Sequence, residues 1–466
     1  MLTLRPYQDD IIDRLRLALR THKAVLADAP CGSGKTALAT KMIGTAAAKG
    51  RRSFFICHRA ELIEQTASAF DKVELPYGYI AAGYRPNPFA QVQIVSIDTL
   101  KNRVGKIQPP DFCVWDESHH IAAKGWSKIR DAYAHAHHVG LSATPERLDG
   151  LGLIKHFSHI VEGPTVKWLI DNGYLCDYKI FTASHAPDLS GVHTKMGDYD
   201  KVELETVMDK PTITGDAIFH YRKLSDGKRA VVFCISVKHS LHVTEQFKSV
   251  GIIAEHLDGT TPKDERRQII SRFRAGQTKV LCNVGIITEG FDLPGIETVV
   301  LLRPTASLGL YVQMVGRALR PVEGKPHALI LDHAGCCLRH GLPDDEREWT
   351  LEGKKRSKKD KNEVAVRQCP KCFAVHRPLP VCPSCGFIYE VKGRPEIEVV
   401  EGELQELDKD AMRRKRFKEQ SKAQTIDELV ALAKSRGYKS PMAWAGYIFT
   451  ARQAKRGIKG KEWWSA

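Results

Sequence analysis

Short runs of β-branched and other apolar residues alternate, in the first part of the chain, with stretches in which apolar residues recur at helical spacing. The strand-like runs cover residues 24–29, 53–58, 91–97, 111–117 and 137–143, and helix-like stretches at 36–48 and 60–70 follow the first two runs. Strands that alternate with helices pair in parallel and are covered by helices on both faces. The pattern predicts an α/β domain with a parallel sheet over residues 1–175.

A second series of the same kind begins at Arg229. Its predicted strands cover residues 230–236, 253–259, 279–285, 298–304 and 327–333, and its predicted helices cover 239–250 and 265–276. The chain is therefore predicted to hold two α/β domains in tandem, the second over residues 226–345. Residues 176–225, between them, contain several Pro and Gly residues and no regular period, which predicts an insertion and a linker.

The strand pattern fades after the second domain. Residues 346–364 carry a run of Lys and Arg and predict a flexible charged linker, and residues 365–392 are expected to form a small separate module. Thr425-Ile-Asp-Glu428 is typical of a capping box that opens a helix, and Ser440-Pro441 of an N-cap followed by proline at the first helical position. Residues 393–466 are thus expected to form a basic tail with two short helices.

Length and composition exclude several classes of protein. A chain of 466 residues is long enough for two to four domains of about 100–200 residues, each with its own core. The shares of apolar residues, 42%, and charged residues, 27%, are typical of globular rather than disordered or fibrous proteins. No apolar run approaches the roughly 20 residues of a membrane helix, and the first residues, MLTLRPYQDD, are too polar for a signal peptide. We expect a soluble, cytoplasmic protein.

The net charge of +15 indicates a polyanionic partner, and the charge is concentrated at one end. Residues 411–466 contain 14 Lys and Arg against 4 Asp and Glu, whereas residues 1–350 contain 44 against 40. A nucleic-acid contact made by the nearly neutral body therefore has to come from a local groove. A tail that only keeps the protein soluble is the alternative.

The segment APCGSGKT, from Ala29 to Thr36, lies between an apolar strand and a helix of small residues. In such a loop the backbone N–H groups and the helix N-terminus hold phosphate, the lysine reaches the β and γ oxygens, and the hydroxyl after it ligates Mg²⁺. The predicted nucleotide-binding residues are Gly32, Ser33, Gly34, Lys35 and Thr36. Ala29 stands where the usual pattern has glycine, and a glycine-rich turn without nucleotide is the alternative.

The apolar run Phe112–Trp115 delivers two acids at its carboxyl end, Asp116 and Glu117. Asp116 is suited to hold Mg²⁺, and Glu117 to orient and deprotonate an attacking water. Two acids after a strand are usually solvated loop residues. Because these follow a phosphate-binding loop in a second strand of one α/β domain, they are the expected partners of that loop.

These motifs resemble those of superfamily II helicases of the DExH type, with the acidic box written DESH, and the resemblance covers residues 1–345. It implies two RecA-like lobes that bind ATP between them. Leu4-Arg5-Pro6-Tyr7-Gln8 resembles the adenine-reading motif, in which Gln8 bonds the base edge and Arg5 or Tyr7 packs near the ring. Ser142-Ala143-Thr144 resembles the motif that couples hydrolysis to movement. The residues that the resemblance places on the nucleic-acid backbone are His58, Arg59, Ser96, Thr99 and Thr288.

The second lobe carries the remaining helicase motifs. TEGFD, residues 288–292, contributes Gly290 and Asp292 to the nucleotide site, and QMVGRALR, residues 313–320, contributes Gln313, Arg317 and Arg320. In this family the two arginines act as fingers on the γ-phosphate, a role worth ~10³–10⁵ in rate. Within the superfamily the motifs most resemble those of RadD-like bacterial and phage DNA helicases, which also carry zinc-binding cysteines after the second lobe.

Four of the twelve cysteines form the pattern CxxC, nine residues, CxxC: Cys369, Cys372, Cys382 and Cys385. Each CxxC turn offers two thiolates to one tetrahedral ion, and nine residues are enough to bring the turns together. The spacing predicts a zinc ribbon. A redox pair lacks its thioredoxin-like setting, and an iron–sulfur cluster is an alternative that four cysteines leave open.

Other clusters are expected to have packing or surface roles rather than metal-binding ones. They are His119 with His120, His135 with His137 and His138, and Cys336 with Cys337 and His340. In the tail, Trp463 and Trp464 are equally suited to stack on bases or to anchor the tail.

The expected function is that of a Mg²⁺–ATP-driven motor on nucleic acid, acting in DNA repair, recombination or replication, in a bacterial or phage-infected cell and near its nucleoid. DNA is favoured over RNA by the resemblance. The alternatives are an RNA helicase and an ATP-switched module that clamps or remodels DNA without separating strands. The basic tail is expected to bind DNA or, through Trp444, Ile448 and the terminal tryptophans, a replication or repair protein.

Overall fold

A computed structural model gives the fold. It describes residues 3–146, 152–182, 187–195, 197–208, 211–287, 293, 295–352, 366–389, 418–436 and 440–455. The chain divides into two units, Met1–Val391 and Lys392–Ala466. In the parts that the structure describes, no helix is long and apolar enough to cross a membrane.

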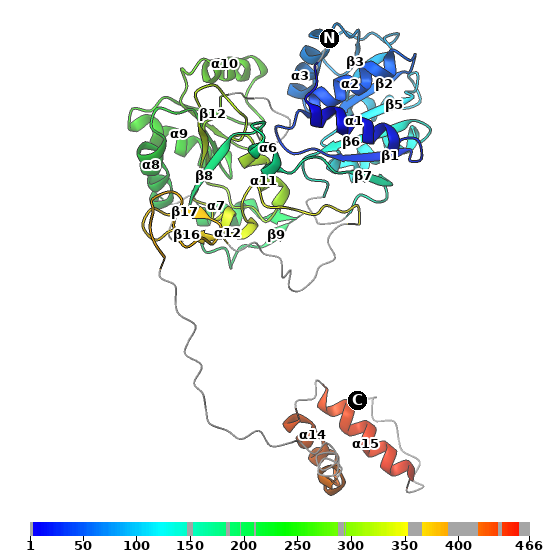
Figure 1. Cartoon of the computed structure of the whole chain (residues 1–466), viewed down its shortest axis with the longest axis vertical. Helices are drawn as coiled ribbons and strands as arrows, with labels where there is room; N and C mark the ends of the chain where they lie inside the picture. Colours follow the sequence, from blue (N-terminus) through cyan, green and yellow to red (C-terminus); the bar gives the residue numbers. More distant parts are fainter. Residues whose placement is uncertain are drawn as a thin grey trace. The chain divides into compact units, whose positions relative to one another are not determined.

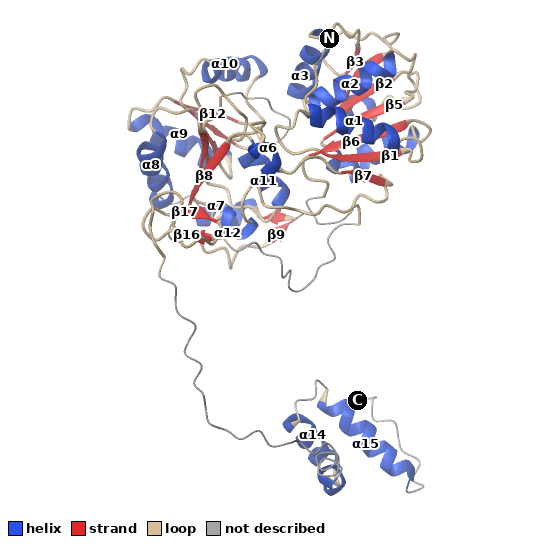
Figure 2. Ribbon diagram, viewed as in Figure 1, coloured by secondary structure: helices blue, strands red, loops and turns tan. Residues whose placement is uncertain are grey.

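The first lobe is built on a seven-stranded parallel sheet with the strand order β3-β4-β2-β5-β6-β1-β7 (Figures 1 and 2). Its strands are β1 (Ala24–Asp28), β2 (Ser53–Cys57), β3 (Gly78–Ile80), β4 (Val92–Ser96), β5 (Phe112–Asp116), β6 (His137–Ser142) and β7 (His159–Val161). Its helices are α1 (Pro6–Ala18), α2 (Lys35–Ala47), α3 (Ala60–Asp71), α4 (Ile97–Leu100), the 3₁₀ helix η1 (Ser118–Ala122), α5 (Lys124–Ala132) and α6 (Val166–Asp171).

Both faces of this sheet are buried, as the near-continuous apolar strands predicted. Phe112 and Val114 of β5 pack into one hydrophobic core, and the alternating residues Cys113 and Trp115 pack into a second core on the opposite face. All parallel strands end at one edge of the sheet, where the loops after β1, β2, β5 and β6 meet. The candidate functional residues follow these strands.

The second lobe has an eight-stranded sheet with the order β12-β13-β11-β14-β15-β8-β17-β16. Its strands are β8 (Asp177–Thr182), β11 (Ala230–Phe233), β12 (Ala254–Leu257), β13 (Val280–Asn283), β14 (Thr298–Leu301), β15 (His327–Asp332), β16 (Arg367–Gln368) and β17 (Ala374–His376). Its helices are α7 (Lys201–Met208), α8 (Pro211–Ser225), α9 (Val237–Ser249), α10 (Lys263–Arg274), α11 (Leu308–Gly316) and α12 (Cys336–His340). The fold class of two RecA-like α/β lobes is confirmed.

Residues 176–225, which we expected to be an irregular insertion and linker, contain regular elements instead. β8 is an inner strand of the second sheet and pairs in parallel with β15 from Asp177 to Thr182. A small antiparallel pair, β9 (Thr194–Lys195) and β10 (Asp198–Tyr199), precedes α7 and α8. The run of β8 is too polar on one face to stand out as a buried strand in the sequence, which is why only the structure identifies it.

The cysteine module also differs from the separate unit that we expected. Its hairpin, β16 and β17, continues the second sheet, because Ala374 and Val375 of β17 pair antiparallel with Phe181 and Ile180 of β8. The Arg377 guanidinium lies 3.2 Å from a carboxylate oxygen of Asp344 and 3.0 Å from one of Asp345, which joins the module to the end of the second lobe. The described part of the module is thus an extension of that lobe.

The second unit contains the predicted pair of tail helices, α14 (Ile426–Ser435) and α15 (Pro441–Lys455). Thr425 and Glu428 form the expected capping box. Leu429 and Ala433 of α14 and Ala445 of α15 are buried, and the Arg452 guanidinium donates to the carbonyl oxygens of Ala423 and Gln420. The helical C-terminal segment predicted from the sequence is therefore confirmed.

Candidate functional site

The phosphate-binding loop joins β1 to α2, and its glycines are required by close approaches. Gly32 has φ +84° and Gly34 has φ +87°. A Cβ atom on Gly34 would lie 2.3 Å from the Gln8 Nε2, and one on Gly32 would lie 2.7 Å from a methyl carbon of Leu175. Only glycine accepts both the positive φ and the missing space. Lys35 then opens α2 at the carboxyl edge of the sheet.

The N-terminal motif, residues 4–8, is hydrogen-bonded to this loop. The Tyr7 hydroxyl and the Gln8 Nε2 each donate to the Ser33 carbonyl oxygen at 2.8 Å, and the Gln8 Oε1 accepts from the Arg5 backbone N–H at 3.0 Å. The predicted adenine-site residues Arg5 and Gln8 are thus brought to the phosphate loop.

Two aromatic side chains that pack against this motif, Tyr174 and Trp168, were not predicted. The Arg5 guanidinium carbon lies 5.0 Å from the ring centroid of Tyr174, and Tyr7 meets the rings of Tyr174 and Trp168 edge-on. Tyr174 and Trp168 belong to no recognisable motif, so no sequence signal marks them.

The two acids lie opposite the lysine. Asp116 ends β5, and Glu117 follows with a positive φ of 47°, a strained backbone for a non-glycine residue. The Lys35 Nζ is 3.6 Å from the Glu117 Oε1, and both side chains are largely buried. Burial and the adjoining Glu117 raise the pKa of Asp116 to about 7. Burial alone would lower the pKa of Lys35, but the charges of Glu117 and its neighbours outweigh burial and raise it.

The second lobe brings its arginines to the same place. A Cβ atom on Gly316, at the end of α11, would lie 2.6 Å from the Cβ of Cys31 in the phosphate loop. Arg317 is buried and acts electrostatically on both Lys35 and Asp116, and the Arg320 Cγ lies 3.8 Å from the Cβ position of Gly32. Gln313, one turn earlier on α11, is also buried. Gly290 and Asp292 lie outside the described residues.

The SAT segment lies against the acidic box. The His119 Nδ1 is 3.5 Å from the Glu117 Oε2 and 3.2 Å from the Ser142 Oγ, which donates to the Thr144 carbonyl oxygen at 2.9 Å. His120 lies against His58, with ring centroids 5.0 Å apart. His138, in contrast, accepts from the Trp115 Nε1 at 3.0 Å within the core.

The predicted nucleic-acid contacts in the first lobe lie after β2 and β4. Arg59 reaches the other lobe, where its Nη1 donates to the carbonyl oxygens of Gly285 at 3.1 Å and Ile286 at 2.9 Å, and its Nε lies 3.1 Å from the His58 Nε2. Ser96 ends β4, and the Thr99 Oγ1 accepts from the Ala82 N–H at 3.1 Å. Thr288 lies outside the described residues.

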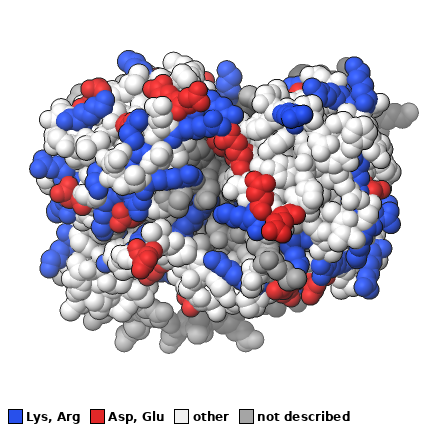
Figure 3. Space-filling model, turned by 90° about the horizontal axis from the view of Figure 1, so that it is seen from above, with Lys and Arg blue, Asp and Glu red and all other residues white. Residues whose placement is uncertain are grey.

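Opposite charges also join the lobes. On α3, Glu61 pairs with Arg266 of α10, and Glu64 lies 2.9 Å from the Lys263 Nζ and 2.7 Å from an Arg267 nitrogen. Seen from the side that carries α3 and α10, acidic and basic side chains are interspersed rather than gathered into one basic face (Figure 3).

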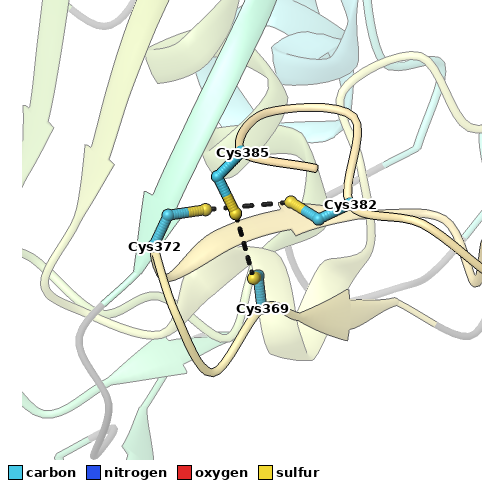
Figure 4. Close-up of side chains that lie close together, drawn as sticks. All are labelled: Cys369, Cys372, Cys382 and Cys385. Atoms are coloured by element: carbon cyan, nitrogen blue, oxygen red, sulfur yellow. Dashed lines mark hydrogen bonds between the residues drawn. The ribbon is translucent and has the colours of Figure 1, made fainter. Parts of the chain in front are cut away.

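The four cysteines of the CxxC pairs point toward one another (Figure 4). Their sulfur atoms all lie within 4.8 Å, and the Cys369–Cys385 and Cys372–Cys382 pairs are each 3.7 Å apart. Zinc–sulfur bonds of ~2.3 Å in a tetrahedron place sulfurs ~3.8 Å apart, so the donor set fits a zinc ion. Within the described ranges, these cysteines form the only cluster of His, Cys, Asp or Glu with this geometry.

Comparisons with known proteins show the family to which the chain belongs. Residues 1–147 match the family of the type III restriction enzyme res subunit, and residues 210–322 match the helicase conserved C-terminal domain. A 51.5 kDa protein of a Lactococcus phage is 34% identical over 411 residues, which cover 87% of each chain.

IRC3 of Saccharomyces cerevisiae, which bears the name of an ATP-dependent helicase, is 30% identical over 354 residues, covering 71% of this chain and 51% of its own. A fragment of an HsdR subunit of a type I restriction enzyme from Vibrio vulnificus has the same fold, with a TM-score of 0.58 and 20% identity over 74% of this chain and 67% of its own. The chain belongs to the superfamily II helicases.

Proposed function

We propose that this chain is an ATP-dependent DNA motor, a helicase or translocase that moves along or unwinds DNA during repair, recombination or replication. The observation that carries the proposal is one site at the junction of the lobes. Lys35 and Glu117 of the first lobe lie 3.6 Å apart, and a Cβ atom on Gly316 of the second lobe, the residue before Arg317, would lie 2.6 Å from the Cβ of Cys31 in the phosphate loop. A nucleotide bound there touches both lobes, so its hydrolysis changes how they are held together.

The loop has the chemistry to hold ATP and Mg²⁺. The Ser33 Oγ and the Asp28 Oδ1 are buried without a hydrogen-bond partner among the described residues. Buried polar atoms are normally hydrogen-bonded, so these two are expected to contact a bound ligand. Thr36 and Asp116 would hold Mg²⁺, which neutralises phosphate charge when bound. Lys35 and the backbone of Gly32 and Gly34 bind the phosphates, and Glu117 orients the attacking water.

A contact chain runs from that water site to the second lobe. It passes from Glu117 through His119 and Ser142 to Thr144, and a Cβ atom on Gly309 of α11 would lie 3.1 Å from the Thr144 Oγ1. We propose that this chain transmits the loss of the γ-phosphate to α11, whose end carries Arg317. The lobes then alternate their grip on the nucleic-acid backbone through residues such as Arg59, Ser96 and Thr99.

DNA is the proposed track for two reasons. The motifs resemble those of DNA helicases of the RadD type, and the first lobe matches a family of restriction enzymes, which act on DNA. The cysteine cluster is proposed to hold one Zn²⁺ and to stabilise the end of the second lobe, and the basic tail to bind the phosphate backbone. Such a motor would work in the cytoplasm of a bacterial or phage-infected cell, near the nucleoid.

The deciding experiment measures ATP hydrolysis with single-stranded DNA, duplex DNA, forked DNA and RNA, followed by strand displacement on the best ligand. Glu117→Gln serves as the hydrolysis-deficient control. Stimulation by DNA together with displacement supports the helicase, and stimulation without displacement identifies a translocase or a remodelling module. Stimulation by RNA alone overturns the proposed DNA motor.

A further inference from the structure

The backbone of the segment that carries Arg317 and Arg320 is fixed by hydrogen bonds to neighbouring groups. After α11 ends at Gly316, residues 317–320 form a turn, and three consecutive carbonyl groups are bound by neighbouring side chains or backbone. Lys325 Nζ donates to the carbonyl oxygens of Ala318 and, at 3.0 Å, Arg320. The Cys176 N–H donates to the Leu319 carbonyl oxygen at 2.8 Å.

Lys325 uses its third proton on a different segment. Its Nζ donates to the Ile296 carbonyl oxygen at 2.8 Å, just before β14. An ammonium group has three N–H donors, and three carbonyl oxygens lie within hydrogen-bond distance of this one. The lysine itself is fixed by a turn, because its N–H donates to the Val322 carbonyl oxygen at 3.1 Å and Pro326 follows.

The cation is stabilised by carbonyl dipoles rather than by a salt bridge. Among the described residues no carboxylate lies within ion-pair distance of Lys325; Cys176, whose side chain also hydrogen-bonds to it, and Glu297 favour its charge, and Arg229 opposes it. Burial lowers the pKa of Lys325 below its ordinary value. A neutral side chain of the same length would leave three carbonyl oxygens without this donor.

We propose that Lys325 is a positioning residue for Arg317 and Arg320 in ATP hydrolysis, an inference that rests on the proposed ATP site. The Arg320 Cγ lies 3.8 Å from the Cβ position of Gly32, on the phosphate loop, while the carbonyl oxygens of Ala318 and Arg320 accept hydrogen bonds from Lys325. Lys325 therefore fixes the backbone from which the arginines reach the γ-phosphate. A displacement of about 1 Å at such a group costs roughly 10²-fold in rate.

The test compares Lys325→Met, which keeps an unbranched side chain and removes the ammonium group, with Lys325→Arg, which keeps the cation. Lys223→Met, at an exposed lysine of α8, is the matched control. We expect Lys325→Met to lower kcat by about 10- to 100-fold with less than a twofold change in the affinity for ATP, and Lys325→Arg to restore much of kcat. The affinity for ADP with aluminium fluoride should fall with kcat, because the arginines contact the transition state.

A double-variant cycle separates positioning from general destabilisation. In an Arg317→Ala, Arg320→Ala background, Lys325→Met should lower kcat no further, since the groups it positions are gone. An additive loss, or a wild-type kcat in Lys325→Met, would overturn the inference. If Lys325→Met does not fold, judged by its unfolding midpoint, Lys325→Gln takes its place in the same cycle. All rates are measured with and without DNA: absence of DNA stimulation in the wild type rejects the proposed motor, while the basal rates still decide the role of Lys325.

Discussion

At the residue scale, the buried pair of Lys35 and Glu117 separates nucleotide binding from hydrolysis. Lys35 is placed to contact phosphate before and during the reaction, whereas Glu117 is placed to act on water only. We expect Lys35→Ala to lose both ATP binding and hydrolysis, and Glu117→Gln to lose at least about 100-fold in kcat while still binding ATP.

Nucleotide affinity measured beside the hydrolysis rate distinguishes the two variants. Lys49→Ala, an exposed lysine just after α2, is the control and should behave like the wild type. Full hydrolysis in either active-site variant would contradict the role assigned to that residue.

The burial of His138 predicts how the stability of the protein depends on pH. It lies in the core with Trp115 and Tyr133, and burial lowers its pKa to about 4. A lowered histidine pKa favours the neutral form, so its contribution to stability is complete above about pH 6.5 and is lost as the pH falls toward 4. Between pH 7 and pH 5 the loss is about 2 kcal/mol.

His138→Gln cannot take up this proton. Its unfolding midpoint should therefore fall less between pH 7 and pH 5 than that of the wild type, even if it starts lower. Equal changes in the two proteins would show that His138 does not titrate in this range.

The sequence predicted those candidate site residues that belong to short contiguous motifs. The phosphate loop, the acids after β5 and the arginines after α11 are each recognisable within eight residues, and the structure brings them together. Lys325, Tyr174 and Trp168 were missed because their roles depend on contacts with segments far away in the chain. Lys325 in a turn is an ordinary surface lysine until the carbonyl groups of Ala318 and Ile296 are seen around it.

At the element scale, the sequence likewise predicted only part of the cysteine hairpin, because its strand pairing depends on a distant segment. The spacing of the cysteines predicted a metal-binding module, but the pairing of β17 with β8 joins strands almost 200 residues apart, and local patterns carry no such information. This pairing also protects the edge of the second sheet. Without the hairpin, β8 becomes an exposed sheet edge, with unpaired backbone groups open to other chains.

We therefore predict that the cysteine cluster stabilises the second lobe as well as itself. The purified protein should contain one zinc ion per chain, and Cys372→Ser should lose the metal and lower the unfolding midpoint of the large unit, because metal binding in so small a module supplies much of its folding energy. Elemental analysis and thermal unfolding provide the measurements.

Ser384→Ala, an exposed residue within the second CxxC turn, is the matched control and should keep both metal and stability. Iron in place of zinc would indicate the iron–sulfur alternative. Loss of zinc with an unchanged unfolding midpoint would show that the β17–β8 pairing adds nothing to the second lobe.

At the scale of the whole molecule, the excess of positive charge is concentrated in the last residues of the chain. Residues 1–350 carry 44 Lys and Arg against 40 Asp and Glu, and several of these charges are engaged in pairs between α3 and α10. Residues 411–466 carry 14 against 4. In the pair of tail helices and the residues before them, Arg452 donates to backbone carbonyl groups and Arg436 pairs with Glu419, so the other cations of the tail are the candidates for binding phosphate.

Truncation after Val391, the boundary of the large unit, should therefore weaken DNA binding without impairing hydrolysis at saturating DNA. Removing one cation that neutralises a phosphate reduces the salt slope of binding by about 0.7–0.9, so the affinity of the truncated protein should fall most at low salt. Replacing Arg413, Arg414, Lys415 and Arg416 by Gln should reproduce part of this change, whereas Trp444→Ala in the same tail should not. If the charge variant keeps the wild-type affinity and salt slope while Trp444→Ala no longer binds a replication or repair partner, the tail is a protein-docking element and its cations only keep it soluble.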